Sequence, residues 1–283
     1  MTIPLVLLVI GWLVNSMSLN SLPIKFMAND GCNIHYSHHV NAGKPTLVLS
    51  NSLGTTMAMW EPQLEVLKNH FSVVCYDSRG HGCSDVFPGS YSVDRLGCDV
   101  VELLDFLDLD KVHFCGLSIG GMVGQWLAAR FPSRINSLVL ANTSACIEPS
   151  SMWQDRINHV QKEGLLSIWG NVLARWLSSD FIKNNAEAVD NMKAMFSSID
   201  SDGYCGCCAA IRDMDLRQVA NLNKLPTLII AGAQDLATPI EHSEYLLSQY
   251  SDGKLITLDA GHLSNVEQTE GFNQAILDFL VER

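Results

Sequence analysis

Hydrophobic residues in this chain occur mostly in short continuous runs separated by longer amphipathic stretches. In Thr46–Ser50 and Thr227–Ala231 the apolar residues stand at successive rather than alternate positions. This pattern is typical of strands buried on both faces of a parallel sheet. By the same reasoning we predict strands over Lys25–Met27, Asn33–Ser37, Thr46–Ser50, Ser72–Tyr76, Lys111–Cys115, Ser137–Ala141, Thr227–Ala231 and Lys254–Asp259.

Helical periodicity fills several of the intervals between these strands. We predict helices over Val93–Leu107, Ile119–Arg130, Glu241–Tyr250 and Gly271–Val281. Strands that alternate with helices form parallel sheets with right-handed crossovers and helices on both faces. The predicted fold class is therefore α/β, with a mostly parallel, doubly wound sheet of eight strands.

The stretch from about residue 143 to 225 interrupts this alternation because it contains no strand-like run. Its apolar residues recur with helical spacing and fall on two faces, one with Trp153, Ile157 and Val160 and the other with Leu165, Ile168, Val172 and Trp176. We interpret residues 143–225 as a helical cap inserted after the sixth strand. Residues 17–142 and 226–283 would then form the core domain.

The N-terminal segment has a different character. Pro4–Val14 is almost entirely apolar and carries no charge. It is shorter than the roughly 20 residues that a membrane-spanning helix needs, and no Lys or Arg precedes it as in a signal peptide. We expect residues 1–16 to be a non-catalytic extension, with Met17 as a plausible start of the ordinary domain; export or membrane anchoring is the alternative. No membrane contact is expected for the core.

Composition narrows the range of functions. The net charge of −12 argues against nucleic-acid binding, which requires a basic surface, but a local arginine could still bind an anionic substrate. The nine cysteines show no zinc-type spacing, so we interpret them as reduced thiols of a cytoplasmic protein and expect no metal site. Oligomeric state does not follow from the sequence.

A Gly-x-Ser-x-Gly turn is the most informative motif in the chain. Gly116-Leu117-Ser118-Ile119-Gly120 follows a predicted strand and leads directly into a predicted helix. This strand–turn–helix context is that of a nucleophile elbow, in which a strained serine is presented above the sheet at a helix N-terminus. Ser118 is therefore the predicted nucleophile.

A serine hydroxyl needs a base, and two later strand ends supply the candidates. Asp235 follows the strand at 227–231, and His262 follows the strand at 254–259. The carboxyl ends of parallel strands share the edge where ligands of open α/β sheets bind. We assign His262 as general base and then acid, and Asp235 as the group that orients its imidazole.

Two other aspartates need to be weighed. Asp259 also lies near His262 in sequence and is the alternative to Asp235. Asp77 follows an earlier strand, and we expect it to brace the turn at 77–82, with Arg79 in an internal ion pair.

An oxyanion hole requires two backbone N–H donors. One should come from Ile119, the residue after the nucleophile. The other should come from the loop Ser50-Asn51-Ser52-Leu53-Gly54, where Leu53 is our choice.

With these motifs quoted, the chain resembles the α/β-hydrolase superfamily and, more narrowly, its 3-oxoadipate enol-lactone hydrolases. The resemblance rests on the segments 50–55, 76–82 and 115–122, and in the cap on Met152-Trp153 and on 204–213. It covers about residues 20–283. Cys83 and Cys205 are departures from the family pattern.

The resemblance implies hydrolysis of an enol-lactone that carries a carboxylate, within the β-ketoadipate pathway of aromatic-compound degradation. Ser118 would form an acyl-enzyme that water, activated by His262, releases as 3-oxoadipate, without a cofactor. An arginine should bind the substrate carboxylate, with Arg156 and Arg212 as candidates, and Trp153 is a candidate pocket residue. For each of these three residues a purely structural role is an equal alternative.

Other activities remain open at this point. A carboxylesterase, a perhydrolase or a C–C bond hydrolase of ring-cleavage products would use the same three residues. A hydrolase-like receptor for a small lactone or ester could also keep them.

Overall fold

The computed structural model describes residues 24–281, so the predicted extension at 1–16 lies outside the described residues. Eight strands form one sheet in the order β1-β2-β4-β3-β5-β6-β7-β8. They are β1 (Lys25–Met27), β2 (Asn33–His39), β3 (Thr46–Ser50), β4 (Ser72–Tyr76), β5 (Val112–Leu117), β6 (Ile135–Ala141), β7 (Thr227–Gly232) and β8 (Gly253–Leu258). All pairings from β4 to β8 are parallel, whereas β2 runs antiparallel to both β1 and β4. The predicted mostly parallel, eight-stranded sheet is confirmed.

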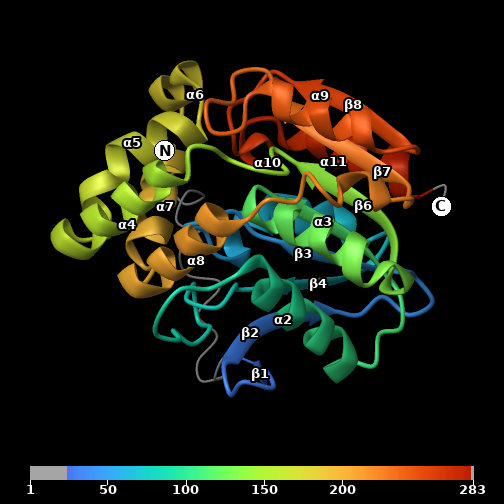
Figure 1. Ribbon diagram of the computed structural model, residues 1–283. Coiled ribbons are helices and arrows are strands. Elements are labelled where there is room, and N and C mark those ends of the chain that lie inside the picture. The colour runs from blue at the N-terminus through green and yellow to red at the C-terminus, as the bar shows by residue number, and fades with distance from the viewer. Residues whose placement is uncertain (1–23, 282–283) are drawn as a thin grey trace, which may run out of the picture.

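Helices cover both faces of this sheet. The core helices are α1 (Glu61–Leu67), α2 (Val93–Phe106), α3 (Ile119–Arg130), α9 (Ile240–Gln249), α10 (Ser264–Glu267) and α11 (Thr269–Leu280). In Figure 1, α2 and α3 lie in front of the sheet and α11 lies behind it. Every residue of β4, β5 and β7 is buried, which is why these strands read as continuous apolar runs.

Only helices occur between β6 and β7. They are α4 (Ser150–Glu163), α5 (Trp169–Trp176), α6 (Ser179–Asn184), α7 (Ala186–Ser197) and α8 (Ser201–Asp213), and Figure 1 shows them gathered beside one edge of the sheet. The apolar residues that define the two predicted helical faces are all buried. The cap boundaries at 143 and 225 stay a prediction.

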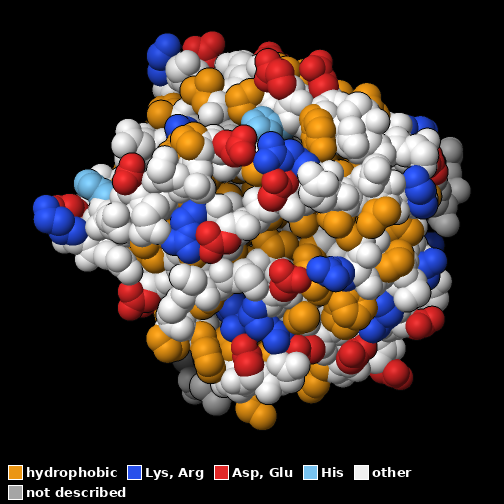
Figure 2. All heavy atoms as spheres, in the orientation of Figure 1, with side chains coloured by type: hydrophobic (Ala, Val, Ile, Leu, Met, Phe, Trp, Pro, Cys, Tyr) orange, Lys and Arg blue, Asp and Glu red, His pale blue; other side chains and the backbone are white. Residues whose placement is uncertain are grey.

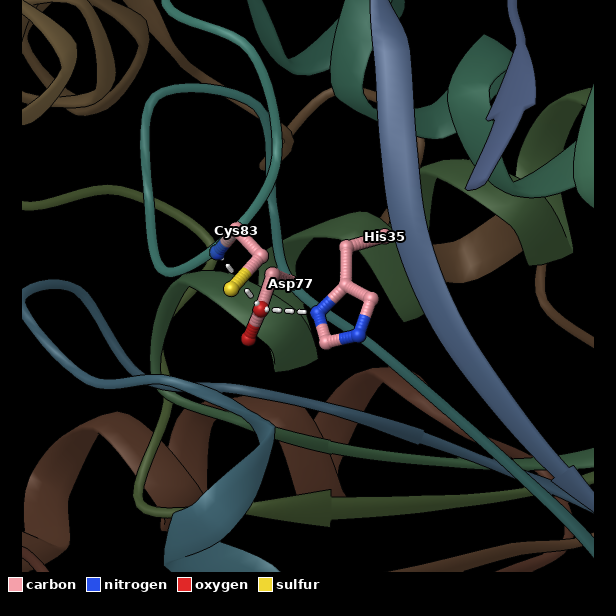
Figure 3. Close-up of side chains that lie close together, drawn as sticks. All are labelled: His35, Asp77 and Cys83. Carbon is pink, nitrogen blue, oxygen red and sulfur yellow. Dashed lines mark hydrogen bonds and ion pairs between the residues drawn. The ribbon is translucent and has the colours of Figure 1, made fainter. Parts of the chain in front are cut away.

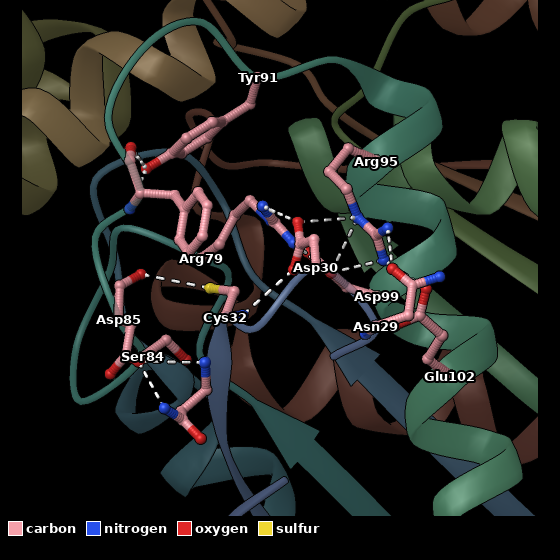
Figure 4. A network of polar contacts seen from close by, with 12 residues as sticks. Asn29, Asp30, Cys32, Arg79, Ser84, Asp85, Tyr91, Arg95, Asp99 and Glu102 are labelled. Carbon is pink, nitrogen blue, oxygen red and sulfur yellow. Dashed lines mark hydrogen bonds and ion pairs between the residues drawn. The ribbon is translucent and has the colours of Figure 1, made fainter. Parts of the chain in front are cut away.

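A network of ion pairs fixes the turn that follows β4. Arg79, only 2% exposed, donates from Nε and Nη2 to both carboxylate oxygens of Asp99 on α2 at 2.7 Å, and its Nη1 lies 2.9 Å from Asp30. Arg95 joins the same network through Asp99 and Glu102, as Figure 4 shows. The internal ion pair predicted for Arg79 is confirmed, and it ties the β1–β2 turn, the turn after β4 and α2 together.

The molecular surface carries mixed charge. On the face drawn in Figure 2, acidic and basic side chains are interspersed among hydrophobic ones. Within residues 24–281, no helix combines the length and the hydrophobicity that crossing a bilayer requires. None of the nine cysteines is in a disulfide.

Candidate active site

Ser118 occupies the tight turn between β5 and α3. Its backbone has φ 58° and ψ −118°, a left-handed conformation that is strained for a serine. The two glycines of the motif make this turn possible. A Cβ on Gly116 would lie 2.1 Å from the Gly120 carbonyl oxygen, and a Cβ on Gly120 would lie 2.3 Å from the Ser50 carbonyl oxygen. The sequence-based interpretation of this motif as a sharp strand-to-helix turn is therefore confirmed.

His262 and Asp235 lie together at the carboxyl edge of the sheet. His262 Nδ1 is 2.9 Å from Asp235 Oδ2, and both side chains are buried. Asp235 follows β7, and His262 follows β8, so the parallel register of these two strands brings the loops together. Asp259 instead accepts a hydrogen bond from Gln234 at 2.8 Å. Of the two aspartates considered from the sequence, Asp235 is the one that faces the imidazole.

Asp235 is held by donors other than the histidine. Oδ1 accepts hydrogen bonds from the backbone N–H groups of Ala237 and Thr238, and Oδ2 accepts from Thr238 Oγ1 and Asn142 Nδ2. Burial by itself would raise the pKa of Asp235, but the neighbouring His262 and these hydrogen bonds together lower it to about 2. The carboxylate therefore stays ionised at neutral pH and accepts a hydrogen bond from the N–H at His262 Nδ1. This arrangement leaves Nε2 free to act as a base.

Ser118 and His262 line the same pocket. Among the described residues, no hydrogen bond joins Ser118 Oγ to His262 Nε2. Catalytic hydrogen bonds are often long or poorly aligned before a substrate binds, so the lack of this hydrogen bond is compatible with a nucleophile–base pair.

The loop after β3 carries the second predicted oxyanion donor. In this loop Ser52 N–H donates to Met59 sulfur, Gly54 N–H to His81 Nε2 and Thr55 N–H to the Ser52 carbonyl. The N–H of Leu53 has no acceptor within residues 24–281, and Leu53 lines the pocket beside Ser118. Ile119 begins α3, where a backbone N–H has no acceptor within the helix. Both N–H groups are thus available to a developing oxyanion.

Burial strongly disfavours the charged form of His81. Its side chain is 2% exposed, and desolvation lowers its pKa to about 4 although the Arg79 carbonyl and the Asp77 carboxylate act in the opposite direction. At neutral pH the uncharged ring can accept the Gly54 N–H at 3.0 Å. His81 therefore holds the loop that carries Leu53, a role that its position in the sequence did not indicate.

The cap supplies the other wall of the pocket. Trp153 and Arg156 come from α4, and Arg175 comes from α5; all three line the pocket with Ser118 and His262. The Arg156 guanidinium lies over the Trp153 ring, 4.7 Å from its centroid. The buried Trp153 Nε1 has no hydrogen-bond partner among residues 24–281.

The two pocket arginines have no carboxylate partner among residues 24–281. Within the described part of the chain, neither Arg156 nor Arg175 forms an ion pair with an acidic side chain. Besides its contact with the Trp153 ring, Arg156 donates a long hydrogen bond of 3.5 Å to the Tyr204 hydroxyl. Burial and, next, the charge of Arg156 lower the pKa of Arg175. Two neighbouring cations that face a pocket form a site suited to an anion.

Arg212 does not reach this pocket. Its guanidinium pairs with the adjacent Asp213 at 2.6 Å and also donates to Gln154. The sequence pattern could not reveal this, because the choice of partner at the end of α8 depends on side-chain packing. Arg175 was not among the residues predicted from the sequence, although its position could have indicated it. It stands three residues after Val172 and one before Trp176, beside an otherwise apolar helical face.

Comparison with known proteins agrees with this geometry. A family model described as the alpha/beta hydrolase fold matches residues 45–163. The 3-oxoadipate enol-lactonase 2 of Acinetobacter baylyi is 39% identical over 243 residues, which are 86% of this chain and 91% of that protein.

Solved structures give the same result. A hydrolase from Pseudomonas aeruginosa PA01 has a TM-score of 0.89 at 44% identity and covers 91% of this chain and 98% of its own. The enol-lactonase from Burkholderia xenovorans LB400 has a TM-score of 0.89 at 37% identity, over 91% of this chain and 99% of that one. The chain therefore belongs to the α/β-hydrolase family and is a hydrolase that resembles the 3-oxoadipate enol-lactonases.

Proposed function

We propose that this hydrolase opens 3-oxoadipate enol-lactone by means of Ser118, His262 and Asp235. One observation carries the proposal. A serine at a strained elbow and an aspartate-paired histidine share a pocket with two arginines that have no carboxylate partner in the described part of the chain. The serine and the aspartate-paired histidine suit ester hydrolysis, and the arginines suit a substrate that carries a carboxylate. The named activity of the similar enol-lactonases supports the same substrate.

In the first half of the reaction, Ser118 Oγ attacks the lactone carbonyl while His262 Nε2 takes the hydroxyl proton. The negative charge that develops on the carbonyl oxygen is stabilised by the N–H groups of Leu53 and Ile119. Collapse of the intermediate breaks the bond to the enol oxygen, and His262 returns the proton to it. Since the substrate is cyclic, the enol stays attached to the acyl group and becomes a ketone there.

In the second half, water attacks the acyl-enzyme. His262 takes a proton from the water, Ser118 leaves with that proton, and 3-oxoadipate is released. One water molecule is consumed for each lactone, so the proposed reaction requires no redox or group-transfer cofactor. This activity would place the protein in aromatic-compound degradation in the cytoplasm.

Arg156 and Arg175 are the proposed ligands of the substrate carboxylate. Arg156 is fixed by stacking on Trp153, and Arg175 approaches from the neighbouring cap helix. A bidentate contact from a guanidinium fixes both the charge and the orientation of the lactone. Arg212 is not included, since Asp213 already neutralises it.

Substitution of the arginines tests this assignment. Arg156→Gln and Arg175→Gln should each raise KM for the enol-lactone by roughly 10-fold or more, the loss expected for a charge-assisted hydrogen bond. Neither change should affect hydrolysis of the uncharged ester p-nitrophenyl acetate. Arg212→Gln is the matched control and should leave both reactions unchanged.

Two outcomes would oppose the proposal. Equal losses on both substrates would mean that the arginines support the fold rather than recognise a carboxylate. Ser118→Ala should lower kcat by a factor on the order of 10⁴–10⁶. Near-normal turnover by this variant would show that Ser118 is not the nucleophile.

A further inference from the structure

A second group of reactive side chains converges at the turn after β4, outside the residues that line the Ser118 pocket. His35 comes from β2, Asp77 directly follows β4, and Cys83 stands six residues later in the turn. Figure 3 shows the imidazole, the carboxylate and the thiol directed toward one another. One ligand atom from each side chain lies within 4.8 Å of those of the other two.

Hydrogen bonds from both side chains and the backbone hold this group in place. His35 Nδ1 is 2.7 Å from Asp77 Oδ2, and the Asp77 N–H donates to the His35 carbonyl at 2.9 Å. The Asp77 carboxylate also accepts the N–H of Met57 on Oδ1 at 2.8 Å and the N–H of Cys83 on Oδ2 at 3.0 Å. The bracing role predicted for Asp77 is confirmed, and the same contacts orient it as a ligand.

The chemistry and the accessibility of the three side chains suit a metal ion. Thiolate, imidazole and carboxylate are the ligand types that Zn²⁺ prefers, and three protein ligands leave a fourth position for water. The Asp77 side chain is 3% exposed and that of His35 is 14% exposed, whereas Cys83 is exposed to solvent. An ion could therefore enter from the Cys83 side and be held against a buried carboxylate.

We propose that His35, Asp77 and Cys83 form a binding site for a divalent transition-metal ion such as Zn²⁺. Because the Asp77 carboxylate only accepts hydrogen bonds, the His35 ring carries its proton on Nδ1 in the absence of metal. On binding, that proton shifts to Nε2, Nδ1 becomes a ligand, and the Cys83 thiol releases its proton to solvent. Each bound ion thus releases one proton from the thiol, in line with the need for deprotonated ligands.

This proposal revises our sequence-based expectation of no metal site. Spacing rules find zinc ligands that lie a few residues apart, whereas His35 and Cys83 are separated in sequence and meet only because β2 pairs with β4. It also gives a use to Cys83, one of the departures from the family pattern. The site is independent of the proposed lactonase activity, which needs none of the three side chains as a reacting group.

Cobalt binding to the full-length, reduced and metal-free protein tests the proposal. Co²⁺ should bind with one equivalent per chain and give a thiolate-to-cobalt charge-transfer band in the near ultraviolet, which added Zn²⁺ should abolish. Cys83→Ser should remove this band. His35→Gln should weaken cobalt binding roughly 10-fold or more, although the Gln side chain can still donate a hydrogen bond to Asp77.

Cys98→Ser is the matched control, since it removes a partly exposed thiol outside the group and should leave the band unchanged. Absence of a thiolate band in the unmodified protein would overturn the proposal. A band that persists in Cys83→Ser would do the same, because it would place the ion on another cysteine.

Discussion

At the scale of single residues, the proposed chemistry depends on the orientation of one imidazole. Asp235 holds His262 at 2.9 Å and is itself fixed by hydrogen bonds from Thr238, Ala237 and Asn142. An aspartate in this position keeps the imidazole in the correct tautomer and stabilises the imidazolium that forms during the reaction.

Asp235→Asn should lower kcat for ester hydrolysis by about 10⁴-fold, because an amide can present the wrong partner to His262 Nδ1. Asp259→Asn is the control and should leave kcat nearly unchanged, since Asp259 contacts Gln234 instead. Steady-state kinetics of both variants provides the measurement. The reverse order of effects would show that Asp259 is the acidic member of the triad.

His81 predicts a pH dependence of stability. Its folded-state pKa of about 4 lies below its ordinary value of 6.5, so between these two values the unfolded chain binds more protons than the folded one. This residue's contribution to the free energy of unfolding should therefore fall as pH decreases from about 6.5 to about 4. His81→Gln keeps a neutral acceptor for the Gly54 N–H, and it should show a shallower fall in urea unfolding across this range. Identical pH profiles for the two proteins would contradict this account.

The sequence was informative about residues at strand ends and less so about residues on helices. The placement of Ser118, Asp235 and His262 at one edge could be predicted because each follows a predicted strand, and parallel strands end at one edge. Arg175 was missed and Arg212 chosen because the sequence does not say which helical arginine has a carboxylate neighbour. That choice depends on how the cap packs.

At the scale of elements, β4, β5 and β7 were predictable because burial on both faces leaves continuous apolar runs. The major helices were predictable because their apolar residues recur with helical spacing. Two short core helices were not predicted: α1 spans seven residues and α10 spans four, too few for a periodic pattern. Contacts that join distant elements were equally invisible. An example is the hydrogen bond from the Gly54 N–H to His81, which supports the loop that carries Leu53.

The Arg79–Asp99 pair should be important for stability because it connects α2 to the turn that carries His81. Asp99→Asn would leave a buried guanidinium poorly compensated and should lower the free energy of unfolding by about 3 kcal/mol. The matched control is Asp105→Asn, which breaks the Arg134 pair at a side chain that is 62% exposed and should cost less than about 1 kcal/mol. Denaturant unfolding of the two variants measures both values, and equal losses would refute the structural role given to the buried pair.

At the scale of the whole molecule, the core and the cap contribute different residues to the proposed active site. The sheet edge presents the proposed nucleophile, base and oxyanion donors, whereas α4 and α5 contribute an aromatic ring and two arginines to the same pocket. In our proposal the core residues supply chemistry that many esterases could share, and the cap helices supply the contacts that select the substrate. Because these two arginines have no carboxylate partner within residues 24–281, they favour the anionic lactone that we propose as the substrate.

The most direct test of this account is the ratio of kcat/KM for 3-oxoadipate enol-lactone to that for p-nitrophenyl acetate, measured with the unmodified protein. The account predicts rapid multiple turnover and a ratio of at least about 10², since a fixed charge contact and a correctly oriented ring together should contribute roughly 3 kcal/mol to transition-state binding. A ratio near one, or retention of the lactone without turnover, would contradict the proposed function.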